Sequence, residues 1–182
     1  MATRGTRFLA SDIWDAPDNG KRYEVIDGGL YISPTPSWRH QLHLSRVQLA
    51  ISIWVHDHHL GYVVGSLTAV VLDEVNGLQP DALFVSHERA HFISERGVEG
   101  PPDLVVEVLS PSTEARDRGL KLRRYAASGV LHYWILDTEG PRIEERVLGD
   151  AGYQLVGTFG PGAVFRPTLF PGLEILLDEI AG

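Results

Sequence analysis

Residues 101–113 read PPDLVVEVLSPST, and the fold that we expect follows from the strand that they predict. The run from Asp103 to Leu109 is almost wholly aliphatic apart from its ends and Glu107, which is typical of a central strand that is buried on both faces. Residues 113–128 then predict a helix, and residues 131–137 predict a second hydrophobic strand. A strand, a helix and a strand in this order indicate a mixed α/β or α+β fold.

Two features upstream of this unit predict further secondary structure. Asp27 and Gly28 lie between two β-rich runs and favour the mirror-image turns of hairpins, which predicts an N-terminal β-hairpin. Residues 37–59 form the longest helical pattern, and we expect this helix to lie on a sheet. The apolar stripe expected on it consists of Leu42, Val47, Leu49, Ala50, Ile53 and Trp54.

Strands account for most of the remaining chain. Three β-rich runs, at residues 61–64, 67–72 and 81–85, predict a meander with a turn at Asn76-Gly77 before the third run. Residues 142–148, 152–158 and 163–166 predict C-terminal strands linked by hairpins. No internal repeat, low-complexity tract or Pro/Ser-rich linker divides the sequence, so we expect residues 1–182 to form one domain.

Composition excludes several classes of function. The sequence has no cysteine, which excludes disulfides, thiolate zinc sites, iron–sulfur clusters and cysteine nucleophiles. It lacks both a signal-peptide pattern and the apolar run of about 18 residues that a membrane helix needs, and we expect a soluble, cytoplasmic protein. Because the formal net charge is −8, nucleic-acid binding would require a local basic patch.

One candidate patch lies between residues 116 and 124, and a solvated helix face is its alternative interpretation. Its basic residues are Arg116, Arg118, Lys121, Arg123 and Arg124. Lys121 lies next to the core-facing stripe of the predicted helix, where a cation would steady an attacking water or a developing negative charge. In the structural alternative, Lys121 simply pairs with Asp117 one turn earlier. The two interpretations are compatible, since one lysine can do both.

Glu107 is unusual because burial of an unpaired carboxylate inside an aliphatic strand costs several kcal/mol. Asp81 begins another apolar strand, and neighbouring strands lie about 4.8 Å apart, so we expect both carboxylates to meet at one point. Two hard oxygen donors suit Mg²⁺ or Mn²⁺. In the alternative interpretation, Asp81 is a turn residue and Glu107 pairs with a basic side chain such as Arg123.

A competing motif consists of His87, Glu88 and His91, which match the HExxH pattern of zinc peptidases. That pattern requires a helix that carries both histidines on one face. The motif directly follows a predicted strand, and the glycines and the proline between residues 96 and 101 leave little room for a helix. A zinc peptidase is therefore the less favoured hypothesis.

Four blocks in order make the chain similar to a known family. They are RYEVIDGGLYISPTP (residues 22–36), followed by His40; QPDALFV (79–85); PPDLVVEVLSPST (101–113); and RDRGLKLRRYAASGVLHYWILD (116–137). From Phe8 to the C-terminus the chain resembles the Uma family of endonucleases, a branch of the restriction-endonuclease-like PD-(D/E)XK superfamily. The resemblance implies an αβββαβ core in which helices flank a mixed central sheet, with an added N-terminal β-hairpin and C-terminal strands.

The resemblance also implies roles for individual residues. Asp81 matches the aspartate of the PD element and Glu107 the acidic residue of the (D/E)XK element, and both would bind Mg²⁺ or Mn²⁺. The lysine position of the second element, two residues after Glu107, holds Leu109, and the basic catalytic role falls to Lys121 on the following helix. Glu24 matches a glutamate of the first hairpin and would act as an auxiliary catalytic residue.

The implied activity is the metal-dependent hydrolysis of phosphodiester bonds in DNA. Arg118, Arg123 and Arg124 would hold backbone phosphates, and His40 would face the substrate from the long helix. Cleavage of both strands would imply a homodimer or a higher homo-oligomer. The alternative is a catalytically degenerate nuclease fold that acts as a binding or assembly module, with Leu109 as the cause of the lost activity.

Overall fold

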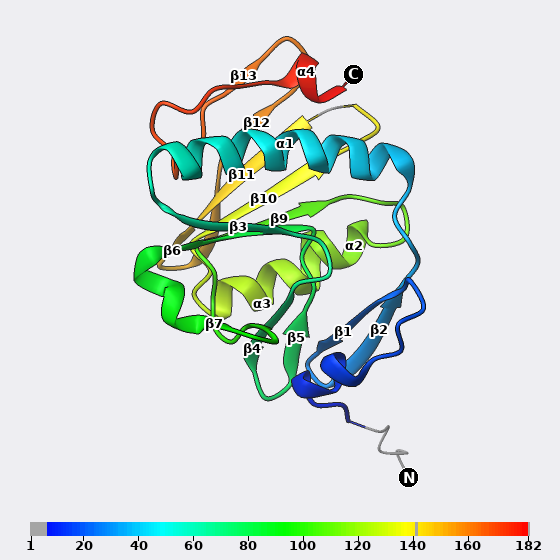
Figure 1. The fold of residues 1–182 in the computed structure, drawn as a ribbon. Helices are drawn as coiled ribbons and strands as arrows, with labels where there is room; N and C mark the ends of the chain where they lie inside the picture. Colours follow the sequence, from blue (N-terminus) through cyan, green and yellow to red (C-terminus); the bar gives the residue numbers. More distant parts are fainter. Residues whose placement is uncertain (1–6, 141, 182) are drawn as a thin grey trace.

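The protein contains two six-stranded β-sheets, with helices packed against them (Figure 1). The structure is a computed structural model, and it describes residues 7–140 and 142–181. In order across the first sheet, the strands are β12 (Gly152–Phe159), β11 (Arg142–Gly149), β10 (His132–Asp137), β9 (Leu104–Val108), β6 (Ala82–Ser86) and β3 (Gly61–Gly65). Across the second sheet they are β2 (Gly29–Ser33), β1 (Arg22–Ile26), β5 (Asn76–Leu78), β4 (Ala69–Asp73), β8 (Gly97–Val98) and β7 (Ile93–Ser94).

The helices connect and cover these sheets. They are α1 (Trp38–Asp57), α2 (Glu114–Arg116), the π-helical turn η3 (Asp117–Lys121), α3 (Leu122–Ala127) and α4 (Leu177–Ala181), with 3₁₀ turns η1 (Ala10–Asp15) and η2 (His87–Phe92). α2, η3 and α3 follow one another without a break, where one helix is predicted. A small ribbon of β13 (Val164–Phe165) and β14 (Ile175–Leu176) precedes α4. Among the described residues, no helix has the length and apolar character that a membrane crossing requires.

β9 is the buried central strand that its sequence predicts. All five of its residues are buried, and it pairs in parallel with β10 and antiparallel with β6. Its even-numbered residues pack in the core beneath α1, whereas Val105 packs on the opposite face against α3. Figure 1 shows α1 and α3 on opposite sides of this sheet. Because side chains alternate along a strand, Glu107 belongs to the α3 face.

The N-terminal hairpin of β1 and β2 is confirmed. Asp27 and Gly28 at its tip have φ angles of 55° and 74°, and these positive values are the signature of a mirror-image turn. The hairpin joins the second sheet through β5, and Ile26 packs in the same core cluster as Val105 and Tyr125. The mixed sheets, the flanking helices and the C-terminal strands likewise agree with the predicted α+β architecture.

The predicted meander is wrong. β3 pairs with β6 in the first sheet, whereas β4 pairs with β5 and β8 in the second. Asn76 and Gly77, predicted as a turn, lie within β5, because the Asn76 side chain bonds Asp73 and the backbone N–H of Asp27 and so ties this strand to the hairpin. A Cβ at Gly77 would lie 2.8 Å from the carbonyl oxygen of Ala10, so glycine serves close packing here.

The predicted face of α1 is partly confirmed, since Ala50 and Trp54 pack against the core as predicted. Val47 is buried as expected, but Leu49 and Ile53 are 60% and 54% exposed. The buried residues of α1 are His40, His43, Leu44, Val47, Ile51 and Val55. Two histidines thus begin the buried face, and an apolar count misses them because it treats histidine as polar.

We expect Leu67→Gly to stabilise the protein. Leu67 has a φ of 72° and is 66% exposed, so its side chain contributes little burial. The left-handed region costs an L-residue about 1–2 kcal/mol, and the greater freedom of glycine in the unfolded chain offsets roughly 0.5–1 kcal/mol of the gain. Urea denaturation should therefore show a gain of up to about 1 kcal/mol, whereas Leu67→Ala, which keeps the strain, should show none. A loss of stability in the glycine variant would contradict this account.

Candidate active site

Asp81 and Glu107 are brought together by the pairing of β6 with β9. The antiparallel register places Ala82 opposite Val106, and its continuation by one residue places Asp81 opposite Glu107. The backbone N–H of Val108 donates to Asp81 Oδ2 over 2.7 Å, which fixes the aspartate against β9. Both side chains are 1% exposed, so two carboxylates lie close together in a buried position.

Lys121 is the buried cation of this cluster. Its Nζ lies 2.9 Å from Glu107 Oε1 and 2.8 Å from Glu24 Oε1, and its own exposure is 0%. Lys121 Nζ also lies 3.3 Å from Asp117 Oδ1, so Lys121 pairs with Asp117 and with Glu107 at the same time. Glu107 therefore pairs with Lys121, and the alternative pairing with Arg123 does not occur.

The helix that carries Lys121 has a local widening at this point. Asp117 and Lys121 are the first and last residues of η3, a π-helical turn, and both are buried although the flanking helical residues are mostly not. Such single turns recur at functional sites. The Tyr133 hydroxyl donates to the carbonyl oxygen of Asp117 over 2.9 Å and so ties the turn to β10. The widened turn directs one cation and one carboxylate towards the α3 face of β9.

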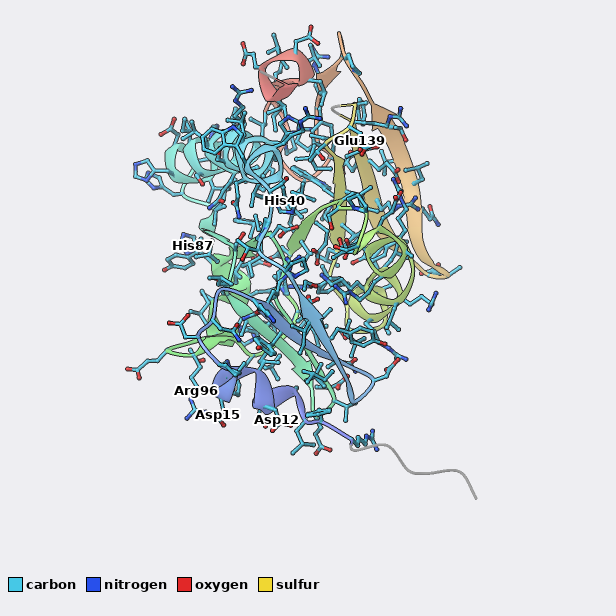
Figure 2. All side chains as sticks on the ribbon, turned by 90° about the vertical axis from the view of Figure 1, so that its right-hand side faces the viewer. Asp12, Asp15, His40, His87, Arg96 and Glu139 are labelled. Carbon is cyan, nitrogen blue, oxygen red and sulfur yellow. The ribbon has the colours of Figure 1, made fainter. Side chains whose placement is uncertain are left out.

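Asp81 has further partners on its other side. Arg22 Nη1 lies 2.7 Å from Asp81 Oδ1, and His40 Nε2 lies 3.3 Å from Oδ2. Figure 2 shows His40 beneath α1, on the side of the helix that faces the strands. Arg22 is not among the members of the cluster that were identified from the sequence. Because residues i and i+2 of a strand share a face, its position two residues before Glu24 is the signal that identifies it.

Burial and neighbouring charges give the two central carboxyls different pKa values. Burial raises the pKa of Glu107 to about 8, against the opposing charge of Lys121. At Asp81, burial is outweighed by the hydrogen bond from His40 and the charge of Arg22, which lower the pKa to about 2. Burial is likewise outweighed at Lys121, whose pKa the surrounding carboxylates raise. The environment therefore favours the charged form of Asp81 and disfavours the charged form of Glu107.

Two buried oxygens indicate that the cluster fits a divalent ion. Glu107 Oε2 and Glu24 Oε2 have no hydrogen-bond partner, and Arg116 approaches the latter only to 3.7 Å. Among the described residues, no three His, Asp or Glu side chains form a ready-made metal site. Mg²⁺, however, binds typically through one or two carboxylates and takes its other ligands from water and substrate phosphates. Asp81 and Glu107 satisfy that requirement.

Leu109 occupies an apolar environment. It is 6% exposed and packs with Tyr125, Val130 and Tyr133 in the core cluster on the α3 face. A lysine here would have to bury its charge among these side chains. Lys121 reaches Glu107 from the neighbouring helix instead, so the cluster contains a lysine although the strand does not.

The predicted DNA-binding arginines lie outside the buried cluster. Arg118 bonds Glu114 at 3.0 Å and Glu144 at 2.6 Å, and Arg124 bonds Asp27 at 2.7 Å. Arg123 is exposed and has no ion pair in the described part of the chain. These arginines and Lys121 therefore belong to the same helical segment but face different surroundings.

The histidines of the zinc-peptidase motif do not form a zinc site. His87, Glu88 and His91 are exposed and lie in η2, a 3₁₀ turn with about three residues per turn, so residues four apart do not share a face. The ring of His87 instead contacts Tyr62 edge to face at 5.5 Å. Figure 2 shows His87 apart from His40, towards the edge of the molecule.

A cavity of about 250 Å³ adjoins the cluster, and both Arg22 and Asp81 line it. Its other lining residues are Gly20, Pro34, Thr35, Pro36, Gln41, Ser66 and Leu67. A larger cavity of about 690 Å³ lies between β3 and residues 93–98, and none of the clustered residues lines it. The smaller cavity is therefore the one of these two that borders Asp81.

Comparisons with known proteins show the family and the fold of the chain. The family model Uma2, described as "Putative restriction endonuclease", matches residues 9–178. A crystal structure of "a putative nuclease belonging to DUF820" from Anabaena variabilis has a TM-score of 0.78 at 16% sequence identity, over 96% of this chain and 97% of that one. That likeness shows a shared fold. An "Uncharacterized protein slr1290" from Synechocystis is 63% identical over 35 residues, which span 19% of this chain and 18% of that protein.

Proposed function

This chain belongs to the Uma2 family, and on that premise we propose that it is a metal-dependent endonuclease that hydrolyses phosphodiester bonds in DNA. The observation that carries the proposal is the buried contact of Lys121 with Glu107, beside Asp81. Two acidic residues and one lysine at a single point supply what assisted phosphodiester hydrolysis requires, namely ligands for a cation and a fixed positive charge.

Asp81 and Glu107 would hold Mg²⁺ or Mn²⁺, with Glu24 as an auxiliary group. A divalent ion in such a site lowers the pKa of bound water and screens the charge of the phosphate. Lys121 and the Tyr125 hydroxyl both donate to Glu107 Oε1, at 2.9 and 3.3 Å, and so leave Oε2 as the free oxygen. The same lysine, held in a water-poor position, stabilises negative charge that develops on the reacting phosphate.

Flanking phosphates would contact the basic helical segment. Arg123 is exposed and would bind a phosphate directly. Arg118 and Arg124 would exchange their carboxylate partners for phosphates. Because such contacts release counterions, DNA binding should weaken as salt rises. Cleavage of both strands of a duplex would require two such sites, for which we propose a homodimer.

Cleavage assays at low salt test the proposal. We expect the wild-type protein to cleave supercoiled, linear or single-stranded DNA with Mg²⁺ or Mn²⁺ and to stop when a chelator is added. Asp81→Asn keeps the shape of the side chain but removes its charge, so it should lower the rate by at least about a hundredfold. Cleavage that is unaffected by chelator, or an Asp81→Asn variant with full activity, would contradict the proposal.

One observation favours a binding or assembly module as the second candidate. Both Asp81 oxygens already accept from protein donors, Oδ1 from Arg22 and Oδ2 from Val108. In an inactive module these contacts would be permanent. Mn²⁺ titration separates the two functions, since the endonuclease binds the ion and Asp81→Asn loses it, whereas the module binds none at millimolar concentration.

A further inference from the structure

Arg22 occupies the side of Asp81 that a metal ion would need. Its Nη1 donates to Asp81 Oδ1 over 2.7 Å and to the carbonyl oxygen of Gln79 over 3.1 Å. The other oxygen, Oδ2, accepts from the backbone of Val108 and lies 3.3 Å from His40. An ion that binds Asp81 through Oδ1 would therefore compete with the Arg22 guanidinium for this oxygen.

The surroundings of Arg22 differ on its two sides. Towards the protein it faces the carboxylates of Asp81 and Glu24, which help to raise its pKa, although burial acts in the opposite direction. On the other side, Arg22 and Asp81 both line the cavity of about 250 Å³. This space gives the guanidinium room to leave Asp81 by rotation of its side chain, without movement of β1.

A guanidinium can bind either the Asp81 carboxylate or a phosphate in the adjoining cavity. Its planar fork of N–H donors matches a carboxylate and a phosphate equally well, and it keeps its charge in either contact. A phosphate that enters the cavity would therefore compete with Asp81 for Arg22. Departure of Arg22 would leave the Asp81 charge without its strongest cation, and a divalent ion would replace that cation.

We propose that Arg22 is a resident counter-ion of Asp81 that transfers to a substrate phosphate, so that binding of DNA opens Asp81 to the divalent ion. The inference rests on the proposed function and adds that DNA binding precedes metal binding at Asp81. Without DNA, Arg22 competes with the metal for Asp81. With DNA, Arg22 binds the phosphate and the metal binds Asp81. By linkage, metal must then also strengthen DNA binding by the same factor.

The test measures binding rather than cleavage, with Mn²⁺ and a nuclease-resistant phosphorothioate duplex as probes. Arg22→Gln removes the competing charge, so we expect its Mn²⁺ affinity without DNA to rise at least about fivefold over the wild type. With saturating Mn²⁺, its affinity for the duplex should fall at least about fivefold, because the phosphate contact is lost. A rise in Mn²⁺ affinity together with a fall in duplex affinity is the result expected if Arg22 transfers from Asp81 to a phosphate.

Arg166→Gln is the matched control. Arg166 is 63% exposed and pairs with Glu174 on the C-terminal ribbon, so its removal changes the net charge equally without touching the cluster. We expect both affinities of this variant to stay within about twofold of the wild type. Arg22→Lys guards against loss of the fold, because it keeps the charge; its Mn²⁺ affinity should match the wild type and its duplex affinity should lie between those of the wild type and Arg22→Gln.

The outcomes are distinguishable. If neither the wild type nor Arg22→Gln binds Mn²⁺, the proposed endonuclease fails and the inference fails with it. If both bind Mn²⁺ equally, Arg22 does not compete with the metal, and the inference is overturned while the endonuclease stands. If Arg22→Gln binds Mn²⁺ more tightly but retains full duplex affinity, Arg22 is a static counter-ion and the transfer is overturned.

Discussion

Replacement of Glu107 by glutamine is expected to abolish metal-dependent DNA cleavage, with a loss of at least about a hundredfold, while the fold persists. The glutamine amide keeps the volume of the side chain and an oxygen that accepts from Lys121. It lacks the negative charge that a divalent cation needs. Because burial raises the pKa of Glu107 to about 8, the site disfavours the charged carboxylate, and a neutral amide fits the same position. We therefore expect a change in unfolding free energy within about 1 kcal/mol.

Glu145→Gln is the matched control for this experiment. Glu145 lies on β11 of the same sheet, is 0% exposed and also has an oxygen without a hydrogen-bond partner. Its other oxygen accepts from the backbone and the hydroxyl of Thr168, away from Lys121. This variant should cleave DNA at the wild-type rate. Equal loss in both variants would show a general effect on the fold, and full activity of Glu107→Gln would remove Glu107 from the mechanism.

Lys121→Met is expected to have the largest effect on stability. Lys121 is fully buried and faces the carboxylates of Glu24, Glu107 and Asp117, which lose their shared cation in the variant. Loss of one partner from a buried ionic cluster costs about 3–5 kcal/mol, because the remaining buried charges lose the cation that compensates them. Urea denaturation should show this loss, and millimolar Mn²⁺ should restore part of it by taking the place of the ammonium.

Lys21→Met provides the comparison, since Lys21 is exposed and is the other lysine of the chain. Its unfolding free energy should stay within about 0.5 kcal/mol of the wild type. A Lys121→Met protein as stable as the wild type would show that the carboxylates take up protons at little cost. Destabilisation without any response to Mn²⁺ would instead count against a metal site among these carboxylates.

The parts of the fold that were predicted correctly are those in which a local pattern has one physical solution. Asp27-Gly28 specifies a mirror-image turn, and an aliphatic run with one glutamate specifies a central strand that is buried on both faces. The meeting of Asp81 with Glu107 was predictable because strand pairing brings the starts and ends of neighbouring strands together. Lys121 was predictable from its position beside the core-facing stripe.

The remaining features depend on contacts between distant segments. The assignment of β4 and β5 to a second sheet depends on their pairing with β1 and β8, which no local pattern shows. The buried face of α1 begins with His40 and His43, whose burial depends on their neighbours in the fold. Arg22 resembles an ordinary strand-edge arginine until Asp81 is placed beside it.

The cluster combines contacts of very different sequence separation, and this has a consequence for folding. Lys121 and Glu107 are 14 positions apart and form within one strand–helix–strand unit, whereas Arg22 and Asp81 are 59 positions apart. Closure of longer loops costs more entropy and slows the formation of contacts. During refolding, the Lys121 contact should therefore form early and the Arg22 contact late. Recovery of activity would then report the docking of the N-terminal hairpin rather than the formation of the central sheet.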